Sequence, residues 1–185
     1  MNTPHYFIAI PVAANVKEEF AKWQEELKKS VSYKQWPWKE DLHITLKFLG
    51  AVEEERIIQL QELLRTIAKQ NHFSISVGGI GTFGRHNSPR VLWAGVEKTE
   101  PLEILFKQIE NAVTSIGFPK ETRPYTPHIT LAKKWNGNDV SPEKLQEIKE
   151  HYQELTFPMN VDSFVLYQIF PSKRPKYEVV ELYKL

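Results

Sequence analysis

Apolar positions follow two spacings along the chain, and the same order of spacings occurs twice. Short apolar runs are typical of strands, whereas apolar residues three or four positions apart are typical of amphipathic helices. In the first half this pattern predicts strands over 6–10, 42–49 and 73–77 and helices over 16–27 and 53–70. In the second half it predicts strands over 91–96, 128–133, 164–170 and 177–183 and helices over 101–116 and 142–152.

The repeated order predicts an α+β protein built from two related halves, near residues 5–80 and 90–170. We expect one bilobal domain over 1–185, in which each lobe is a small sheet with helices on its outer face. The lobes would be related by a pseudo-twofold axis and would face a central cleft. The glycine-rich stretch 78–84 is the expected link between them.

The second strand of each half carries the same four residues, His43-Ile44-Thr45-Leu46 and His128-Ile129-Thr130-Leu131. Composition alone would give roughly 0.3 His-x-Thr matches in a chain of this kind. Residues i and i+2 of a strand point to one face, so each motif places an imidazole and a hydroxyl together. A pseudo-twofold pairing would bring both sets to one cleft.

Two imidazoles and two hydroxyls are suited to opening a cyclic phosphate. A neutral imidazole can take a proton from the attacking water while a protonated one gives a proton to the departing ribose oxygen. The hydroxyls can hydrogen-bond the non-bridging oxygens, where charge builds up in the transition state. The pattern requires no metal, and neither motif has a nearby third ligand of the kind that zinc sites use. A structural role for both histidines would not explain the duplication.

The chain resembles the 2H phosphoesterase superfamily, in particular the LigT-like (ThpR-like) RNA 2′,3′-cyclic phosphodiesterases once called 2′-5′ RNA ligases. The resemblance runs nearly end to end and is strongest at four segments. These are 7–11 (FIAIP), 41–50 (DLHITLKFLG), 89–96 (PRVLWAGV) and 123–133 (RPYTPHITLAK). The paired His-x-Thr-x motifs are the signature of that superfamily.

The resemblance implies two antiparallel sheets around a central cleft. It also implies that His43 is the proton donor, that His128 is the proton acceptor and that the ring opens to leave a 2′-phosphate. The residues alone do not settle the order of the two histidines. Some members of the family also join RNA ends through a 2′-5′ bond without ATP.

Several residues near the motifs are candidates for substrate binding. Lys133 and Arg123 could attract a phosphate or be solvated charges, and Lys133 stands where the family often has arginine. Phe7 could stack a base or pack in the core. Strict alternation places Lys134, rather than Lys133, on the face of His128, and it places Phe48 on the face opposite His43.

Two tryptophans, Trp36 and Trp38, precede the first motif. They could form a wall of the cleft or cover an edge of the core.

The composition narrows the partners. A net charge of +1 gives no global attraction to nucleic acid, so any RNA contact must come from a local basic patch. The absence of cysteine excludes disulfides and a cysteine nucleophile. We find no signal peptide and no apolar run of membrane-spanning length, and we expect a cytoplasmic monomer with no cofactor.

The expected partners are RNA or nucleotides with 2′,3′-cyclic phosphate ends. Two alternatives remain open from the sequence. The substrate could instead be another nucleotide-derived cyclic phosphate or a 2′-5′ oligonucleotide. The protein could also bind RNA ends without cutting them.

Overall fold

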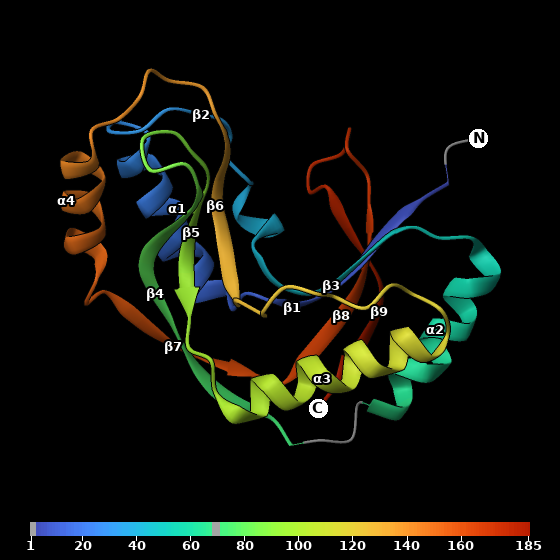
Figure 1. The fold of residues 1–185 in the computed structure, drawn as a ribbon. Coiled ribbons are helices and arrows are strands. Elements are labelled where there is room, and N and C mark those ends of the chain that lie inside the picture. Colours follow the sequence, from blue (N-terminus) through green and yellow to red (C-terminus); the bar gives the residue numbers. More distant parts are fainter. Residues whose placement is uncertain (1–2, 68–70) are drawn as a thin grey trace.

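The computed structural model describes residues 3–67 and 71–185, which form one antiparallel sheet with four α-helices and a short 3-10 helix (Figure 1). The strands are β1 (His5–Pro11), β2 (Tyr33–Gln35), β3 (His43–Ala51), β4 (Phe73–Gly84), β5 (Pro89–Val96), β6 (His128–Trp135), β7 (Thr156–Val161), β8 (Ser163–Ile169) and β9 (Tyr177–Lys184). The helices are α1 (Ala14–Leu27), α2 (Glu54–Ile67), α3 (Glu100–Ser115), α4 (Pro142–Tyr152) and the 3-10 helix η1 (Lys39–Asp41).

The sheet has two lobes that meet at a single backbone pair. Its strand order is β7-β4-β5-β6-β3-β1-β8-β9, with β2 paired to the free part of β6. β3 and β6 pair only at Ile44 and Ile129, so the strands on either side of this point diverge. Lobe one contains β3, β1, β8 and β9, and lobe two contains β6, β5, β4 and β7. The predicted α+β architecture is confirmed, and the two expected sheets are continuous through this one pair.

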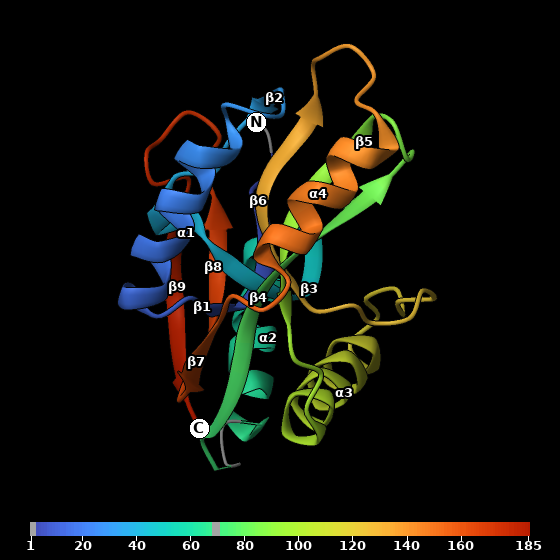
Figure 2. The same ribbon diagram turned by 90° about the vertical axis from the view of Figure 1, so that its left-hand side faces the viewer.

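Each half of the sequence contributes a strand to both lobes. β4 belongs to the first half but pairs with β5 in lobe two, whereas β8 belongs to the second half but pairs with β1 in lobe one. The helices follow the same exchange. In lobe two, Trp23 of α1 packs against Tyr152 of α4 at 4.6 Å and against Phe157 of β7 at 5.8 Å between ring centroids. Figures 1 and 2 show α2 and α3 together on the other lobe.

The glycine-rich stretch 78–84 is not a link between the lobes, so that prediction is wrong. It is the second part of β4, which pairs with β5 through two register shifts. Glycine is needed there for packing, since a Cβ on Gly81 would lie 2.1 Å from the Trp93 ring. β2 and β7 were not predicted, and the last three residues of the helix predicted over 53–70 lie outside the described residues. In the part of the chain that the structure describes, no helix is long and apolar enough to cross a membrane.

Candidate active site

The two His-x-Thr motifs lie side by side where the lobes meet. Ile44 pairs with Ile129 in antiparallel register, and both isoleucines are fully buried. By strand alternation they point to the face opposite the motif histidines. In this register His43 lies across from Thr130, and Thr45 lies across from His128. Each hydroxyl therefore has one imidazole on its own strand and the other imidazole across the junction.

Each histidine ring is oriented by the backbone two residues before it. Nδ1 of His43 lies 2.7 Å from the carbonyl oxygen of Asp41, and Nδ1 of His128 lies 2.8 Å from that of Thr126. A carbonyl oxygen can only accept, so each Nδ1 carries a proton and donates it. Nε2 is then the nitrogen of each ring that can gain or lose a proton. Nε2 of His43 lies 3.1 Å from the Thr45 hydroxyl oxygen.

The His43 ring packs against two aromatic rings. Its ring centroid is 4.7 Å from that of Phe7 and 5.2 Å from that of Tyr177. Burial lowers the pKa of His43 to about 4, although its hydrogen bond to the Asp41 carbonyl acts in the opposite direction. The positive charges of Lys133 and His128 lower this pKa further. His43 is therefore neutral at pH 7 in the free protein.

His128 is flanked by aromatic rings from β4 and β5. Its ring centroid lies 5.0 Å from Phe83, edge-on, and 6.1 Å from Trp93. The Trp93 indole can occupy this position because residue 81 is glycine. Both histidines are thus fixed by a backbone carbonyl and by aromatic neighbours.

A pocket of about 360 Å³ opens over the motif residues. His43, Thr45, Thr130 and Lys133 line it. His128 is not one of its lining residues, but the register of β3 and β6 places it across from Thr45, which is. The remaining lining residues are Phe7, Pro37, Asp41, Phe48, Ile169, Pro171, Lys176 and Tyr177. Within residues 3–67 and 71–185, no three His, Asp or Glu side chains gather as a metal-binding group.

A β-bulge follows the threonine of each motif. In the pairing of β1 with β3, Ile8 faces Lys47 and Ala9 faces Thr45, so Leu46 is the extra residue. In the pairing of β5 with β6, Leu131 is extra in the same way. A bulge inserts one residue and reverses the alternation of faces beyond it. The residue five positions after each histidine, Phe48 or Lys133, therefore returns to the pocket side.

The bulges overturn two predictions that assumed strict alternation. Phe48 is not in the core: it is 60% exposed and lines the pocket. Lys133 rather than Lys134 faces the site, and Lys134 is exposed with a φ of 64°. Burial lowers the pKa of Lys133, and the charges of Lys176 and Lys134 lower it further.

The other two candidates for substrate binding, Phe7 and Arg123, differ in their positions. Phe7 lines the pocket but is only 3% exposed, because its ring packs against His43, Tyr167 and Tyr177. Its position is that of a support for the His43 ring. Arg123 is exposed, does not line the pocket and pairs with Glu121 at 3.5 Å.

Sequence reasoning missed three residues of the site: Asp41, Lys176 and Tyr177. Oδ1 of the buried Asp41 accepts hydrogen bonds from the backbone N–H of Lys176 at 2.8 Å and of Tyr177 at 3.3 Å. Its carbonyl holds His43, so one residue ties the start of β9 to the imidazole. Asp41 stands two residues before the motif and could have been noticed there, whereas no local pattern marks Lys176 or Tyr177.

Comparison with known proteins identifies the family. The family model described as LigT like Phosphoesterase matches residues 10–93 and again 95–177. The chain therefore belongs to the LigT-like phosphoesterase family. It is 37% identical to a Bacillus subtilis protein named RNA 2′,3′-cyclic phosphodiesterase, covering 98% of this chain and 97% of that protein.

A Geobacillus stearothermophilus protein of the same name is 35% identical, but this chain spans only 58% of its length. Among solved structures, the Escherichia coli LigT protein complexed with 3′-AMP has the same fold. The TM-score is 0.80 at 24% identity, and the match covers 99% of this chain and 98% of that one. A Thermus thermophilus protein, TT0787, matches with a TM-score of 0.81 at 24% identity over 98% of this chain and 97% of that one.

Proposed function

We propose that this protein hydrolyses 2′,3′-cyclic phosphates at RNA ends to 2′-phosphates, with His43 and His128 as acid and base. The observation that carries the proposal is the antiparallel meeting of the two motifs at Ile44 and Ile129. In this register each hydroxyl has one imidazole on its own strand and the other across the junction, and each Nδ1 is held by a backbone carbonyl, which leaves Nε2 for proton transfer. The names of the relatives support this choice of substrate.

In the proposed step, Nε2 of His128 takes a proton from water as the water oxygen bonds to phosphorus. The bond from phosphorus to O3′ breaks, and Nε2–H of His43 gives its proton to O3′. The product is a 2′-phosphomonoester with a free 3′-hydroxyl. The Thr45 and Thr130 hydroxyls donate hydrogen bonds to the non-bridging oxygens as their charge increases.

The acid role of His43 requires that its imidazole be protonated in the complex. In the free protein burial and the neighbouring cations oppose this. A bound phosphate adds a negative charge between the same groups, and an opposite charge at short range favours the protonated form. The substrate would therefore help to protonate its own acid.

The test is turnover of 2′,3′-cyclic AMP and of cyclic-ended RNA in EDTA, with identification of the phosphate position in the product. We expect a 2′-phosphate and a kcat reduced by ~10²–10⁴-fold in His43→Ala and in His128→Ala. His86→Ala, which changes an exposed histidine outside the site, is the matched control. No turnover by the wild type, or undiminished turnover in both site variants, would overturn the proposal. Tight RNA binding without a product would instead favour an RNA-end binding module.

The division of roles has its own test. A diester with a p-nitrophenol leaving group does not need an acid, so His43→Ala should recover most of its loss on such a substrate while His128→Ala should not. The reverse result would exchange the two roles. An RNA 5′-hydroxyl in place of water would give a 2′-5′ bond by the same step, so joining should be assayed with an added acceptor RNA.

A further inference from the structure

A second pocket, of about 260 Å³, adjoins the one over the motifs. The two pockets share five lining residues: Pro37, Asp41, Lys133, Lys176 and Tyr177. The second pocket continues between the segment of Trp36 and Trp38 and the loop joining β8 to β9. A molecule held at the motifs can therefore extend into it without leaving the surface.

The second pocket gathers positive charge in a protein whose net charge is only +1. Lys133, Lys173, Arg174 and Lys176 all line it, and Asp41 is the one carboxylate among its lining residues. Oδ1 of Asp41 is already occupied by two backbone N–H groups. Lys173 is paired with Glu178. Among the described residues, none of the other three cations forms an ion pair within 4 Å.

The segment of Trp36, Pro37 and Trp38 forms the wall of the second pocket opposite the β8–β9 loop, and hydrogen bonds hold this wall in place. The Arg174 guanidinium lies 5.1 Å from the centre of the Trp38 ring, and both tryptophans are partly exposed. Between them, the carbonyl of Pro37 accepts a hydrogen bond from the buried Gln24 amide at 2.9 Å. The same amide donates to the carbonyl of Leu131, the bulged residue of β6, at 2.9 Å. The wall is thereby fixed to the strand that carries His128.

Flat aromatic side chains beside a row of cations are the usual means of binding single-stranded nucleic acid. A cyclic phosphate occupies the 3′ end of an RNA, so every other nucleotide of that strand lies on its 5′ side. Resting on the function proposed above, we propose that the pocket of Trp36, Trp38 and Arg174 holds the nucleotide and phosphate immediately upstream of the cyclic end. The protein then prefers single-stranded RNA over a mononucleotide.

The experiment compares kcat/KM for 2′,3′-cyclic AMP with kcat/KM for a six-nucleotide RNA that ends in the same nucleotide. We expect the wild type to prefer the six-nucleotide RNA. The measured quantity is kcat/KM for the six-nucleotide RNA divided by kcat/KM for 2′,3′-cyclic AMP. Arg174→Gln and Trp38→Ala should each lower this ratio about tenfold, which is within the effect of one stacked base. Lys107→Gln, at an exposed lysine of α3 far in the sequence from both pockets, is the charge-matched control. The same preference predicts a steeper salt dependence for the six-nucleotide RNA. The slope of log binding constant against log salt concentration should be steeper by about 0.7 for each upstream phosphate contact.

The outcomes separate the two proposals. A wild type that cleaves both substrates, with a ratio that Arg174→Gln and Trp38→Ala leave unchanged, would overturn the upstream subsite alone. A wild type that cleaves neither would overturn the proposed function and the subsite with it. Because Arg174 is exposed, Arg174→Gln should retain the circular dichroism spectrum and melting temperature of the wild type. A lower ratio of the two kcat/KM values in that variant would then report weaker binding of the upstream nucleotide and not a change in the fold.

Discussion

The imidazole of His43 is neutral in the free protein because it is buried, and the positive charges of Lys133 and His128 oppose its protonation further. We predict that ¹H–¹⁵N spectra of its ring give a pKa of about 4 in the free protein. Addition of 3′-AMP should raise that pKa, since the phosphate brings the missing negative charge. Titration near the ordinary value of ~6.5 without ligand would contradict the prediction.

The same pKa shift makes the stability depend on pH. The unfolded chain binds a proton at residue 43 below about 6.5 and the folded chain only below about 4, so the unfolded state is favoured as the pH falls through this window. The free energy of unfolding should fall by at most ~1.4 kcal/mol per pH unit from this group. In His43→Asn this part of the decrease should vanish. Denaturant unfolding at pH 7 and pH 5 measures the difference, and equal pH dependence in both proteins would be evidence against it.

Phe48 is the most exposed of the aromatic rings around the pocket, so under the proposed function we expect it to stack the terminal base. Phe48→Ala should lower kcat/KM for 2′,3′-cyclic AMP roughly tenfold, while Phe48→Tyr should retain most of it. Ribose 2′,3′-cyclic phosphate has no base and should be cleaved equally by all three proteins. An equal loss on both substrates would mean that the residue acts on the fold or the catalytic groups instead.

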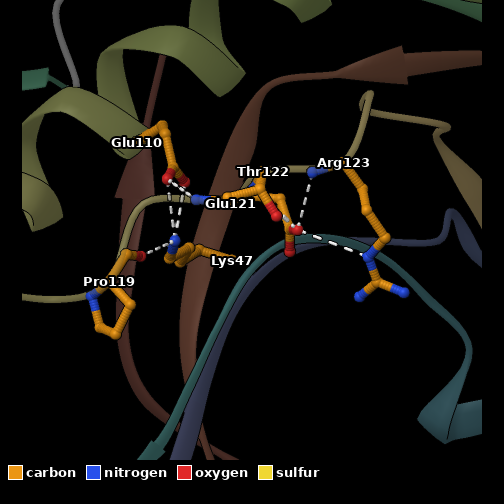
Figure 3. A network of polar contacts seen from close by, with 6 residues as sticks. All are labelled: Lys47, Glu110, Pro119, Glu121, Thr122 and Arg123. Atoms are coloured by element: carbon orange, nitrogen blue, oxygen red, sulfur yellow. Dashed lines mark hydrogen bonds and ion pairs between the residues drawn. The ribbon is translucent and has the colours of Figure 1, made fainter.

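A buried ion pair connects β3 to α3 and to the loop that leads into β6 (Figure 3). The Lys47 amino group donates to both carboxylate oxygens of Glu110 at 2.9 Å and to the Pro119 carbonyl, and Glu110 accepts from the Glu121 N–H. Both side chains of the pair are only 8% exposed. The bulge at Leu46 turns Lys47 toward α3, so the strand that carries His43 is fixed to the loop before His128.

Removing one partner should leave a buried charge without compensation. We predict that Lys47→Met destabilises the fold by about 3–5 kcal/mol, whereas the double variant with Glu110→Leu recovers much of that loss. Guanidinium unfolding of the two single variants and the double variant measures the coupling. Additive losses would show that the pair is not a unit.

At the scale of single strands, sequence periodicity predicted the two strands that carry the motifs. It did not predict the orientation of the residues that follow each motif. The alternation of His43, Ile44 and Thr45 holds because no bulge interrupts it. Phe48 and Lys134 were misplaced because an extra residue at Leu46 or Leu131 has no mark in the local pattern. What stabilises the second bulge is distant in sequence, the Gln24 amide on the Leu131 carbonyl.

At the scale of the whole molecule, the exchange of β4 and β8 makes the lobes interdependent. All five tryptophans lie on α1, β5, β6 or the segment around β2, which belong to or cover lobe two, and Trp38 also contacts Arg174 of the β8–β9 loop. Tryptophan fluorescence therefore reports mainly on lobe two and far-ultraviolet circular dichroism on both lobes. We predict one cooperative unfolding transition with the same midpoint by both methods. Two separate midpoints would show that the lobes unfold independently.

The exchange itself could not be predicted from the sequence. Periodicity identified the strands other than β2 and β7 but carries no information on the distant partner of a strand, so each half was assigned to one lobe. β4 is joined to β5 by residues 85–88 alone, but the halves had been divided at this point, and only the long-range pairing with β7 places β4 firmly in lobe two. The class of fold follows from the order of elements, whereas the composition of each lobe follows from contacts across the chain.

The two bulges put chemically unlike side chains at equivalent places, an aromatic ring after the first histidine and a lysine after the second. Two imidazoles related by a twofold axis would accept a nucleotide in either of two opposite directions. In the proposed function, Phe48 on one side and Lys133 on the other would distinguish a base from a phosphate chain and so give the nucleotide a single polarity. That polarity would decide which ribose oxygen faces which histidine, and hence which hydroxyl is left without phosphate.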